Sequence, residues 1–191
     1  TEAMAAWARG EPLRVVWSAR PGEAWPARLA EAVAATAALG RGVVVCLPDR
    51  RDVDRLDQEL SCRLGPDRHV VLTADAGPAE RYRGFLAVSR GAVRVAIGTR
   101  AAAFAPVHDL GLVVIWDDGD DLFAEPRAPY CHTREVLLLR ARQTGAGALL
   151  GGFARSVEAH YLIRTGWAQE VVSAREALRE RLIHLYDSEA F

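Results

Sequence analysis

The sequence contains no lysine. All 24 of its basic residues are arginine, and 25 acidic residues leave a formal net charge of -1. Chemistry that needs an ε-ammonium group is therefore excluded, including the lysine with which a phosphate-binding loop grips a nucleotide. A net charge so close to zero gives no overall attraction to nucleic acid, so any contact with DNA has to come from a local group of arginines.

Cysteine and long apolar runs are also scarce. The three cysteines, Cys46, Cys62 and Cys131, stand far apart and form no CxxC pair. We therefore expect reduced thiols rather than a zinc site or a disulfide framework. No apolar stretch approaches the roughly 20 residues that cross a bilayer, and no charged-then-apolar leader opens the chain. These absences predict a soluble, cytoplasmic protein with no membrane partner.

The sequence does contain enough apolar residues for one substantial core. Its 191 residues, 50% of them hydrophobic, suit one domain better than two. Because the chain begins at Thr1 rather than at methionine, we interpret it as a fragment of a longer protein. We predict a single domain over residues 1–191, with its core at about 13–172 and a short helix and an edge strand within 173–191.

Short apolar runs alternate with segments of helical period along the chain. Runs that are apolar along their whole length are typical of parallel strands buried on both faces. The expected strands are 13–17, 43–47, 69–73, 93–99, 110–116 and 147–152, and the expected helices are 26–40, 51–65, 78–91, 131–145 and 155–165. This alternation predicts an α/β fold with a doubly wound, mostly parallel sheet, helices on both faces, and ligands at the carboxyl ends of the strands.

The segment WSARPGEAW (17–25) follows the first expected strand, where a nucleotide-hydrolysing enzyme has its phosphate loop. Such a loop needs glycines, a lysine for the phosphates and a Ser or Thr hydroxyl for magnesium. Gly22 stands at the position of the last glycine, but Glu23 replaces the lysine and Ala24 replaces the Ser or Thr. We interpret the segment as an ordinary strand-to-helix turn, and residual nucleotide binding in another mode is the alternative.

The segment LVVIWDDGDDLF (112–123) ends an apolar run in a cluster of carboxylates. A magnesium site would need an Asp at the tip of the strand and a Glu beside it to activate water. Trp116 stands at that tip, and Asp117 and Asp118 are each one methylene shorter than glutamate. We expect a solvated acidic loop without metal, and a new divalent-metal site made by its four aspartates is the alternative. We also predict that Trp116 packs at the carboxyl edge of the sheet, in the space of the nucleotide and its magnesium.

The most distinctive motifs lie between residues 80 and 141. They are Gly98-Thr99-Arg100-Ala101, then Phe104 and Pro106, then Leu110-Gly111-Leu112, and finally Cys131-His132-Thr133-Arg134-Glu135. Over roughly residues 13–165 the chain resembles the first RecA-like lobe of the PriA family of replication restart helicases. Three ATP-handling motifs of that family, Gly-Lys-Thr, Asp-Glu-Glu-His and Gly-Ser-Ala-Thr-Pro, are here replaced in order by Gly22-Glu23-Ala24, Trp116-Asp117-Asp118-Gly119 and Gly151-Gly152-Phe153-Ala154-Arg155.

The resemblance implies a RecA-like, P-loop NTPase-like lobe that has lost its ATP-handling residues and kept its other motifs. We therefore expect no catalytic residue, no cofactor and no metal in this domain. The hypothesis is a DNA-binding or primosome-assembly scaffold in replication restart. Its partners would be forked or single-stranded DNA, reached through the parent protein, and primosome or other replication restart proteins. The alternatives are a divergent ATP-dependent 3′→5′ DNA helicase with an unconventional nucleotide site and a protein-interaction module without DNA contact.

The resemblance also points to candidate DNA-binding residues. Thr99 and Arg100 belong to a turn that lies near the single strand in helicases of this broad type, where hydroxyl and backbone N–H groups bind phosphate and arginine adds charge. His132 and Arg134 come from the second retained motif. The alternatives are that Arg100 anchors the following loop by hydrogen bonds and that His132 and Arg134 act structurally at a helix start.

One further candidate lies in loop 122–134, where the family carries an aromatic-rich segment that couples DNA to ATP hydrolysis. Here the loop holds two aromatic residues, Phe123 and Tyr130, with Arg127 between them. Arg127 is the candidate for DNA binding. Aromatic side chains can stack on bases, but we expect Phe123 to pack in the core instead.

Overall fold

The computed structural model of the protein describes residues 12–172, in which strands and helices alternate. The helix and the edge strand expected within 173–191 therefore lie outside the described residues. The strands are β1 (Arg14–Ser18), β2 (Gly42–Cys46), β3 (Val70–Leu72), β4 (Val95–Gly98), β5 (Leu110–Trp116), β6 (Gly147–Gly152) and β7 (Gln169–Val172). The helices are α2 (Trp25–Ala38), α3 (Arg50–Leu64), α4 (Pro78–Ser89), α5 (Thr133–Thr144) and α6 (Val157–Arg164), with short 3-10 turns η1 (Arg100–Phe104) and η2 (Asp121–Phe123).

The strands form one sheet in the order β3-β4-β2-β5-β6-β1-β7, and every neighbouring pair is parallel. This confirms the predicted α/β fold with a doubly wound parallel sheet. The four residues of β7 form a short strand at one edge of the sheet, where they pair with β1. Because all strands run the same way, the segments that follow them gather at one edge of the sheet, where ligands of such folds bind.

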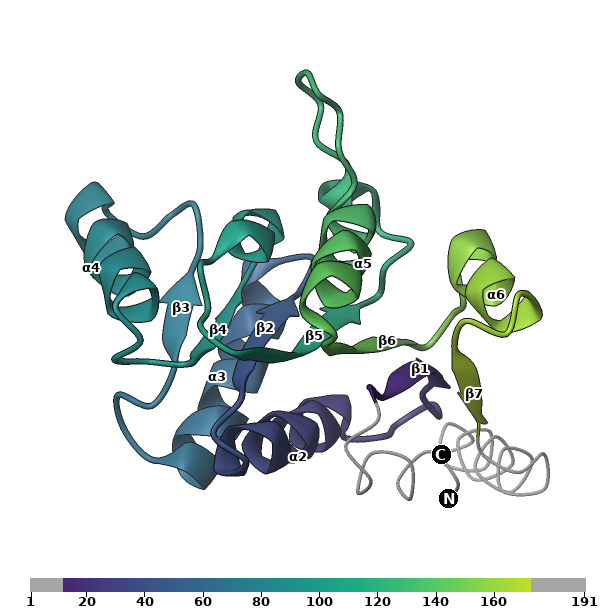
Figure 1. Cartoon of the computed structure of the whole chain (residues 1–191), viewed down its shortest axis with the longest axis horizontal. Coiled ribbons are helices and arrows are strands. Elements are labelled where there is room, and N and C mark those ends of the chain that lie inside the picture. Colours follow the sequence, from purple (N-terminus) through teal and green to yellow (C-terminus); the bar gives the residue numbers. More distant parts are fainter. Residues whose placement is uncertain (1–11, 173–191) are drawn as a thin grey trace, which may run out of the picture.

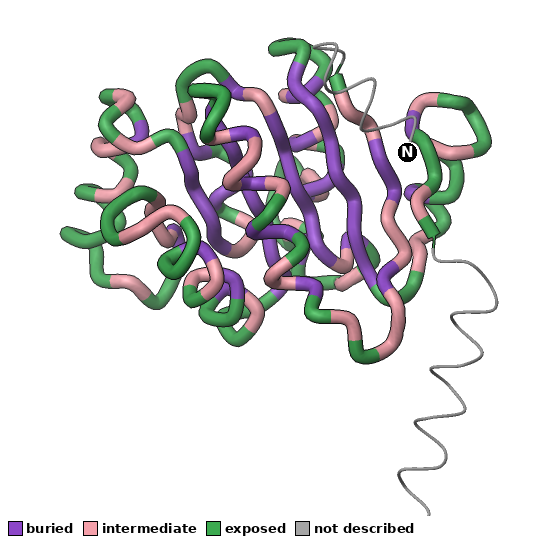
Figure 2. The backbone as a smooth tube through the Cα atoms, turned by 90° about the horizontal axis from the view of Figure 1, so that it is seen from below, coloured by how far each residue is buried: buried purple, intermediate pink, exposed green. Residues whose placement is uncertain are grey.

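Helices cover both faces of the sheet. Figure 1 shows α2 and α3 on one face and α4, α5 and α6 on the other. Side chains alternate along β2 accordingly: Val43 and Val45 join the apolar cluster under α2 and α3, while Val44 and Cys46 join the cluster under α5. Strands β2, β4 and β6 are buried along their whole length (Figure 2). Burial raises the pKa of the Cys46 thiol to about 12, so this cysteine stays protonated in the core.

Local sequence signals explain where the helices begin and end. Helix α2 has a proline in its first turn, and the chain turns away at Gly40 with φ +71°, a conformation that favours glycine. Helix α3 is capped by Asp49, whose side chain accepts a hydrogen bond from the Asp52 N–H at 2.9 Å. Ser156 caps α6 in the same way, at 3.0 Å from the Ala159 nitrogen.

The cysteines behave as expected. Cys46 is buried, Cys62 is exposed, Cys131 is intermediate, and all three are free thiols. Among the helices within residues 12–172, none combines the length and the apolar character that crossing a membrane requires.

Candidate functional site

An aromatic cluster fills the carboxyl edge of the sheet between β1 and β5. Trp116, the last residue of β5, is 3% exposed. Its ring stacks on Trp25 with centroids 4.4 Å apart and planes 12° apart, and it also contacts Trp17 at 5.6 Å. Phe153 meets the Trp116 ring edge-on at 5.3 Å. These four residues, Trp17, Trp25, Trp116 and Phe153, are called the aromatic cluster below.

The aromatic cluster joins the three segments at which, by the resemblance, the family carries its ATP-handling motifs. Trp17 belongs to β1 and Trp25 begins α2, on either side of the turn between these elements, while Phe153 follows β6. Gly151 makes room for the rings, since a Cβ atom there would lie 3.0 Å from Trp17 and 3.1 Å from Trp116. The prediction that Trp116 packs at the carboxyl edge is confirmed.

The segment between β1 and α2 is a tight turn closed by a carboxylate. Glu23 Oε2 accepts a hydrogen bond from the Arg20 N–H at 2.9 Å, and the Glu23 N–H donates to the Arg20 carbonyl at 3.0 Å. Gly22 adopts φ +71° between them. Ala24 precedes α2 without any side-chain capping bond. The geometry matches the expected strand-to-helix turn.

The acidic motif is not the solvated loop that the sequence predicted. Asp118 is 4% exposed, and its Oδ2 lies 2.8 Å from Arg134 Nη1 and accepts a hydrogen bond from Ser156 Oγ at 2.7 Å. Asp117 is half-buried with φ +56°, and burial, followed by the charges of Asp120 and Asp118, raises the pKa of its carboxyl group. In the described part of the chain, no group of three or more acidic, histidine or cysteine side chains is placed to hold a metal ion.

Arg134 is enclosed by carboxylates rather than presented to solvent. Its side chain is 6% exposed, with Glu158 at 3.2 Å and Glu135 at 3.0 Å in addition to Asp118. This geometry corrects the expectation that Arg134 offers its charge to DNA and favours the structural role at a helix start. Its neighbour His132 caps α5, because Nδ1 accepts the Arg134 N–H at 3.2 Å. Burial, and then the charge of Arg134, lowers the pKa of His132, which keeps the ring neutral and able to accept.

Arg100 anchors the segment that follows β5. Its Nη1 donates to the carbonyls of Leu122 and Ala124, each at 3.0 Å, and its Nη2 lies 3.2 Å from Glu125. This is the alternative role that the sequence left open for Arg100, although its side chain is still 35% exposed. Thr99, just before it, is half-buried at the start of η1.

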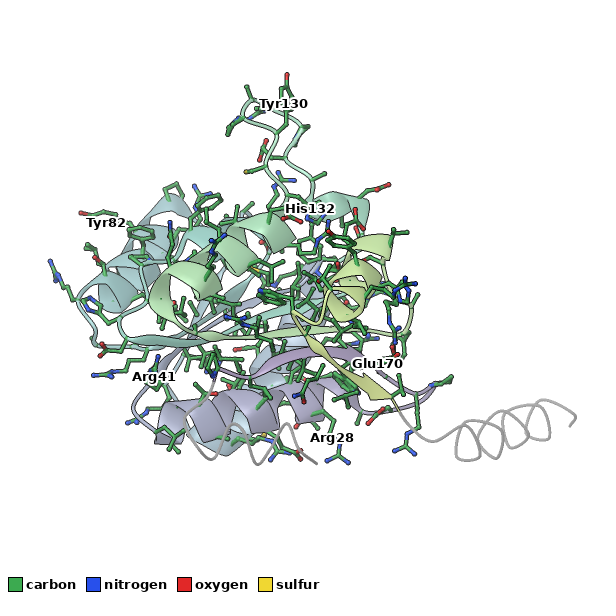
Figure 3. The ribbon with its side chains drawn as sticks, turned by 45° about the vertical axis from the view of Figure 1, so that its right-hand side comes forward. Arg28, Arg41, Tyr82, Tyr130, His132 and Glu170 are labelled. Carbon is green, nitrogen blue, oxygen red and sulfur yellow. The ribbon has the colours of Figure 1, made fainter. Side chains whose placement is uncertain are left out.

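Residues 124–132 form a projecting hairpin above α5, with Tyr130 near its tip and His132 at its base (Figures 1 and 3). An antiparallel bridge joins Ala124 to His132, and the Glu125 N–H donates to the Cys131 carbonyl at 3.0 Å. Tyr130 is 71% exposed and Arg127 is exposed beside it. Phe123, at the foot of the hairpin, is fully buried, which confirms that it packs in the core.

Two residues of this edge carried no functional expectation from the sequence. Ser156 links Asp118 to the start of α6, and its position before an apolar helical segment was the available signal, because serine favours that cap. Arg155 donates to Ser18 Oγ at 3.1 Å and pairs with Glu170, so it ties together the ends of β1 and β7. No local pattern in the sequence indicates that second link.

Sequence comparison finds relatives among replication restart proteins. The chain is 51% identical over 178 residues to the probable replication restart protein PriA of Mycobacterium tuberculosis, a match that covers 93% of this chain and 27% of that protein. It is 49% identical over 178 residues to the probable replication restart protein PriA of Mycobacterium leprae, and the match again covers 93% of this chain and 27% of that protein. The identity to the replication restart protein PriA of Bacillus subtilis is 23% over 146 residues, a match that covers 76% of this chain and 18% of that protein. The chain thus spans about a quarter of the length of its mycobacterial relatives. No protein-family model matches it.

Solved structures of helicases share the fold. Yeast Dbp5 bound to RNA and ADP BeF3 (Saccharomyces cerevisiae) superimposes with a TM-score of 0.57 at 12% identity, covering 91% of this chain and 44% of that one. The helicase Lhr of Mycobacterium smegmatis, bound to ssDNA and AMP-PNP, gives 0.56 at 14% identity, covering 85% and 23%. Identities this low bear on the fold alone, which is the RecA-like fold of helicase lobes.

We predict that Trp116→Ala lowers the free energy of unfolding by about 3–5 kcal/mol, because it removes the central ring of the aromatic cluster and leaves a cavity. Urea titration followed by circular dichroism measures the change. Phe153→Ala is the matched control, since Phe153 is 54% exposed and its loss should cost far less. Equal costs for the two variants would contradict a packed cluster centred on Trp116.

We also predict that Arg134→Met costs about 3–5 kcal/mol, because it leaves the Asp118 carboxylate buried without its partner. In a double-mutant cycle, Asp118→Asn combined with Arg134→Met should cost less than the sum of the two single changes. The same urea titrations provide all four corners of the cycle. Strict additivity would mean that the two side chains do not interact energetically.

Proposed function

Since the chain belongs to the PriA family of replication restart proteins over the segment that it shares with them, we propose that it is a helicase-like lobe that no longer hydrolyses ATP. In this proposal the lobe serves its parent protein as a DNA-binding or primosome-assembly scaffold and needs no cofactor of its own. Its partners are forked or single-stranded DNA and other replication restart proteins.

The observation that carries the proposal is the aromatic cluster. In a working lobe of this fold, the segments after β1 and β5 hold a triphosphate and its magnesium. Here Trp25 and Trp116 stack on each other at 4.4 Å, and the buried carboxylate that follows β5, Asp118, is engaged by Arg134 and Ser156. Indole rings offer neither charge for phosphate nor ligands for a divalent cation, so the edge is suited to packing rather than to hydrolysis.

The projecting hairpin supports the DNA-binding half of the proposal. It presents an exposed aromatic ring, Tyr130, and an exposed cation, Arg127, away from the body of the lobe. An aromatic ring that stacks on bases and an arginine that contacts phosphate together make a sequence-tolerant site for single strands. Arg100, which the resemblance made a candidate for DNA binding, donates hydrogen bonds to the foot of the hairpin. In this proposal it contributes to DNA binding by holding the hairpin in place.

The role in replication restart belongs to the parent protein, because the chain corresponds to 27% of its mycobacterial relatives. Those relatives are named for replication restart, and the names bear on this chain only through shared ancestry. Recruitment of primosome proteins is the part of the proposal that rests on the family alone.

We predict that the purified parent protein binds no ATP through this lobe up to millimolar concentration in the presence of magnesium, because the chain has no lysine and residues 12–172 hold no group of side chains placed to bind the metal ion of the complex. Isothermal titration calorimetry measures the affinity, and phosphate release with and without forked DNA measures hydrolysis. The same preparation must bind forked DNA, which shows that it is folded. Micromolar binding of ATP, or DNA-stimulated hydrolysis lost with this lobe, would overturn the proposal in favour of a divergent helicase.

We predict that Tyr130→Ala and Arg127→Ala each weaken the binding of single-stranded DNA by the parent about tenfold, in line with roughly 1–3 kcal/mol for one stacked base. Fluorescence anisotropy at several salt concentrations measures this, and Arg127→Ala should also reduce the salt slope by about one. Arg63→Ala is the control, since it removes the same charge from α3 beside the amino ends of the strands. If all three variants bind DNA as the unmodified protein does, the hairpin makes no DNA contact.

A further inference from the structure

The turn between β1 and α2 holds a carboxylate among groups that suit an anion. Glu23 Oε2 accepts the Arg20 N–H at 2.9 Å. Its two oxygens also face two guanidinium groups, with Arg20 Nε at 3.8 Å and Arg28 Nε at 3.9 Å. One backbone donor and two arginines around a single anion resemble the donor set with which proteins bind phosphate.

The carboxylate lies deeper than the arginines that surround it. The Glu23 side chain is 14% exposed, whereas those of Arg20 and Arg28 are 39% and 57% exposed. A surface hollow adjoins the turn and is lined by these three residues together with Gly22, Ala24 and Ala27, and it is bounded by Glu31. The buried end of the hollow is thus negative and its rim is positive.

We propose that Glu23 acts as an intramolecular anion that occupies the place of a phosphate group and closes this turn to phosphates from outside. The inference deepens the proposed function and rests on it, since it identifies what keeps the former loop empty of nucleotide. The loss of lysine removes one attraction for phosphate. The Glu23 carboxylate adds a repulsion, accepts the Arg20 N–H and faces both guanidinium groups, so Glu23 determines the specificity of the turn.

In this proposal the groups that could bind an external anion are still present in the turn, and Glu23 occupies them. Without the negative charge of Glu23, the Arg20 N–H and the two guanidinium groups remain around a hollow with a net positive lining. The ligand class that fits such a donor set is a small oligophosphate, of which inorganic pyrophosphate is the simplest probe. Adenine and ribose are not required for such a contact.

The test compares pyrophosphate binding by the complete chain carrying Glu23→Gln with binding by the unmodified chain, using calorimetry at low salt. Glu31→Gln is the matched control, because Glu31 lies on the rim of the same hollow and pairs with Arg28 at 3.0 Å. Both variants lose one negative charge, and only Glu23→Gln removes it from the side chain that accepts the Arg20 N–H. We expect Glu23→Gln to bind pyrophosphate at least about tenfold more tightly than Glu31→Gln or the unmodified chain. Equal affinities for the two variants would overturn the proposal.

A second measurement needs no variant and so does not depend on the folding of Glu23→Gln. In the isotope-labelled unmodified chain, the Arg20 amide resonance should not move when pyrophosphate is added to millimolar concentration, because its N–H is already bonded to Glu23. A shift of that resonance at lower concentrations would contradict the proposal. Either failure leaves the proposed loss of ATP hydrolysis intact, whereas ATP hydrolysis by the parent would overturn the function whatever pyrophosphate does.

Discussion

The stacking of Trp116 on Trp25 is the contact on which the carboxyl edge of this lobe depends. It joins the end of the central strand β5 to the start of α2. The contact requires Gly151 in β6, where any side chain would meet the rings. It also places Phe153 over the outer edge of Trp116. Three strands and one helix are therefore held together by packed aromatic rings. Burying these rings and placing them in contact with one another stabilises the folded state.

The acidic segment that follows β5 is held by internal contacts of its own. A carboxylate at the end of β5 that serves no metal would be costly to bury unless it were paired and hydrogen-bonded. Asp118 has both kinds of partner, since Arg134 supplies charge and Ser156 supplies a hydroxyl. Arg134 begins α5 and Ser156 begins α6, so one carboxylate fixes the start of two helices. The same arginine lies next to the His132 cap at the base of the hairpin, which couples the hairpin to this buried pair.

The architecture could be predicted from the sequence because it follows from local patterns. The apolar runs predicted the buried strands. Strand β2, with the sequence GVVVC, is fully buried, and a strand covered on both faces needs no polar residue. The position of Trp116 also followed, because the last residue of a buried strand has to lie at the edge. The burial of Asp118 did not follow. Its partners are 16 and 38 residues away in the chain, and no periodicity connects them. The pairing of Glu23 with Arg20 was equally invisible, since an acidic residue near a helix start has an ordinary explanation in the helix dipole.

The aromatic cluster and the buried ion pair of Asp118 with Arg134 have a mechanical consequence for the proposed function. A lobe whose ligand site is filled by its own side chains has no ligand-bound state that differs from its free state, and a ligand can shift a conformation only through such a difference. The hairpin is held by Arg100 from one side and by the His132 cap from the other, and both contacts lie within the lobe. Under the proposed loss of nucleotide binding, the orientation of the hairpin is expected to be independent of nucleotide. A surface fixed in this way would suit the proposed scaffold better than a motor that releases and rebinds its track.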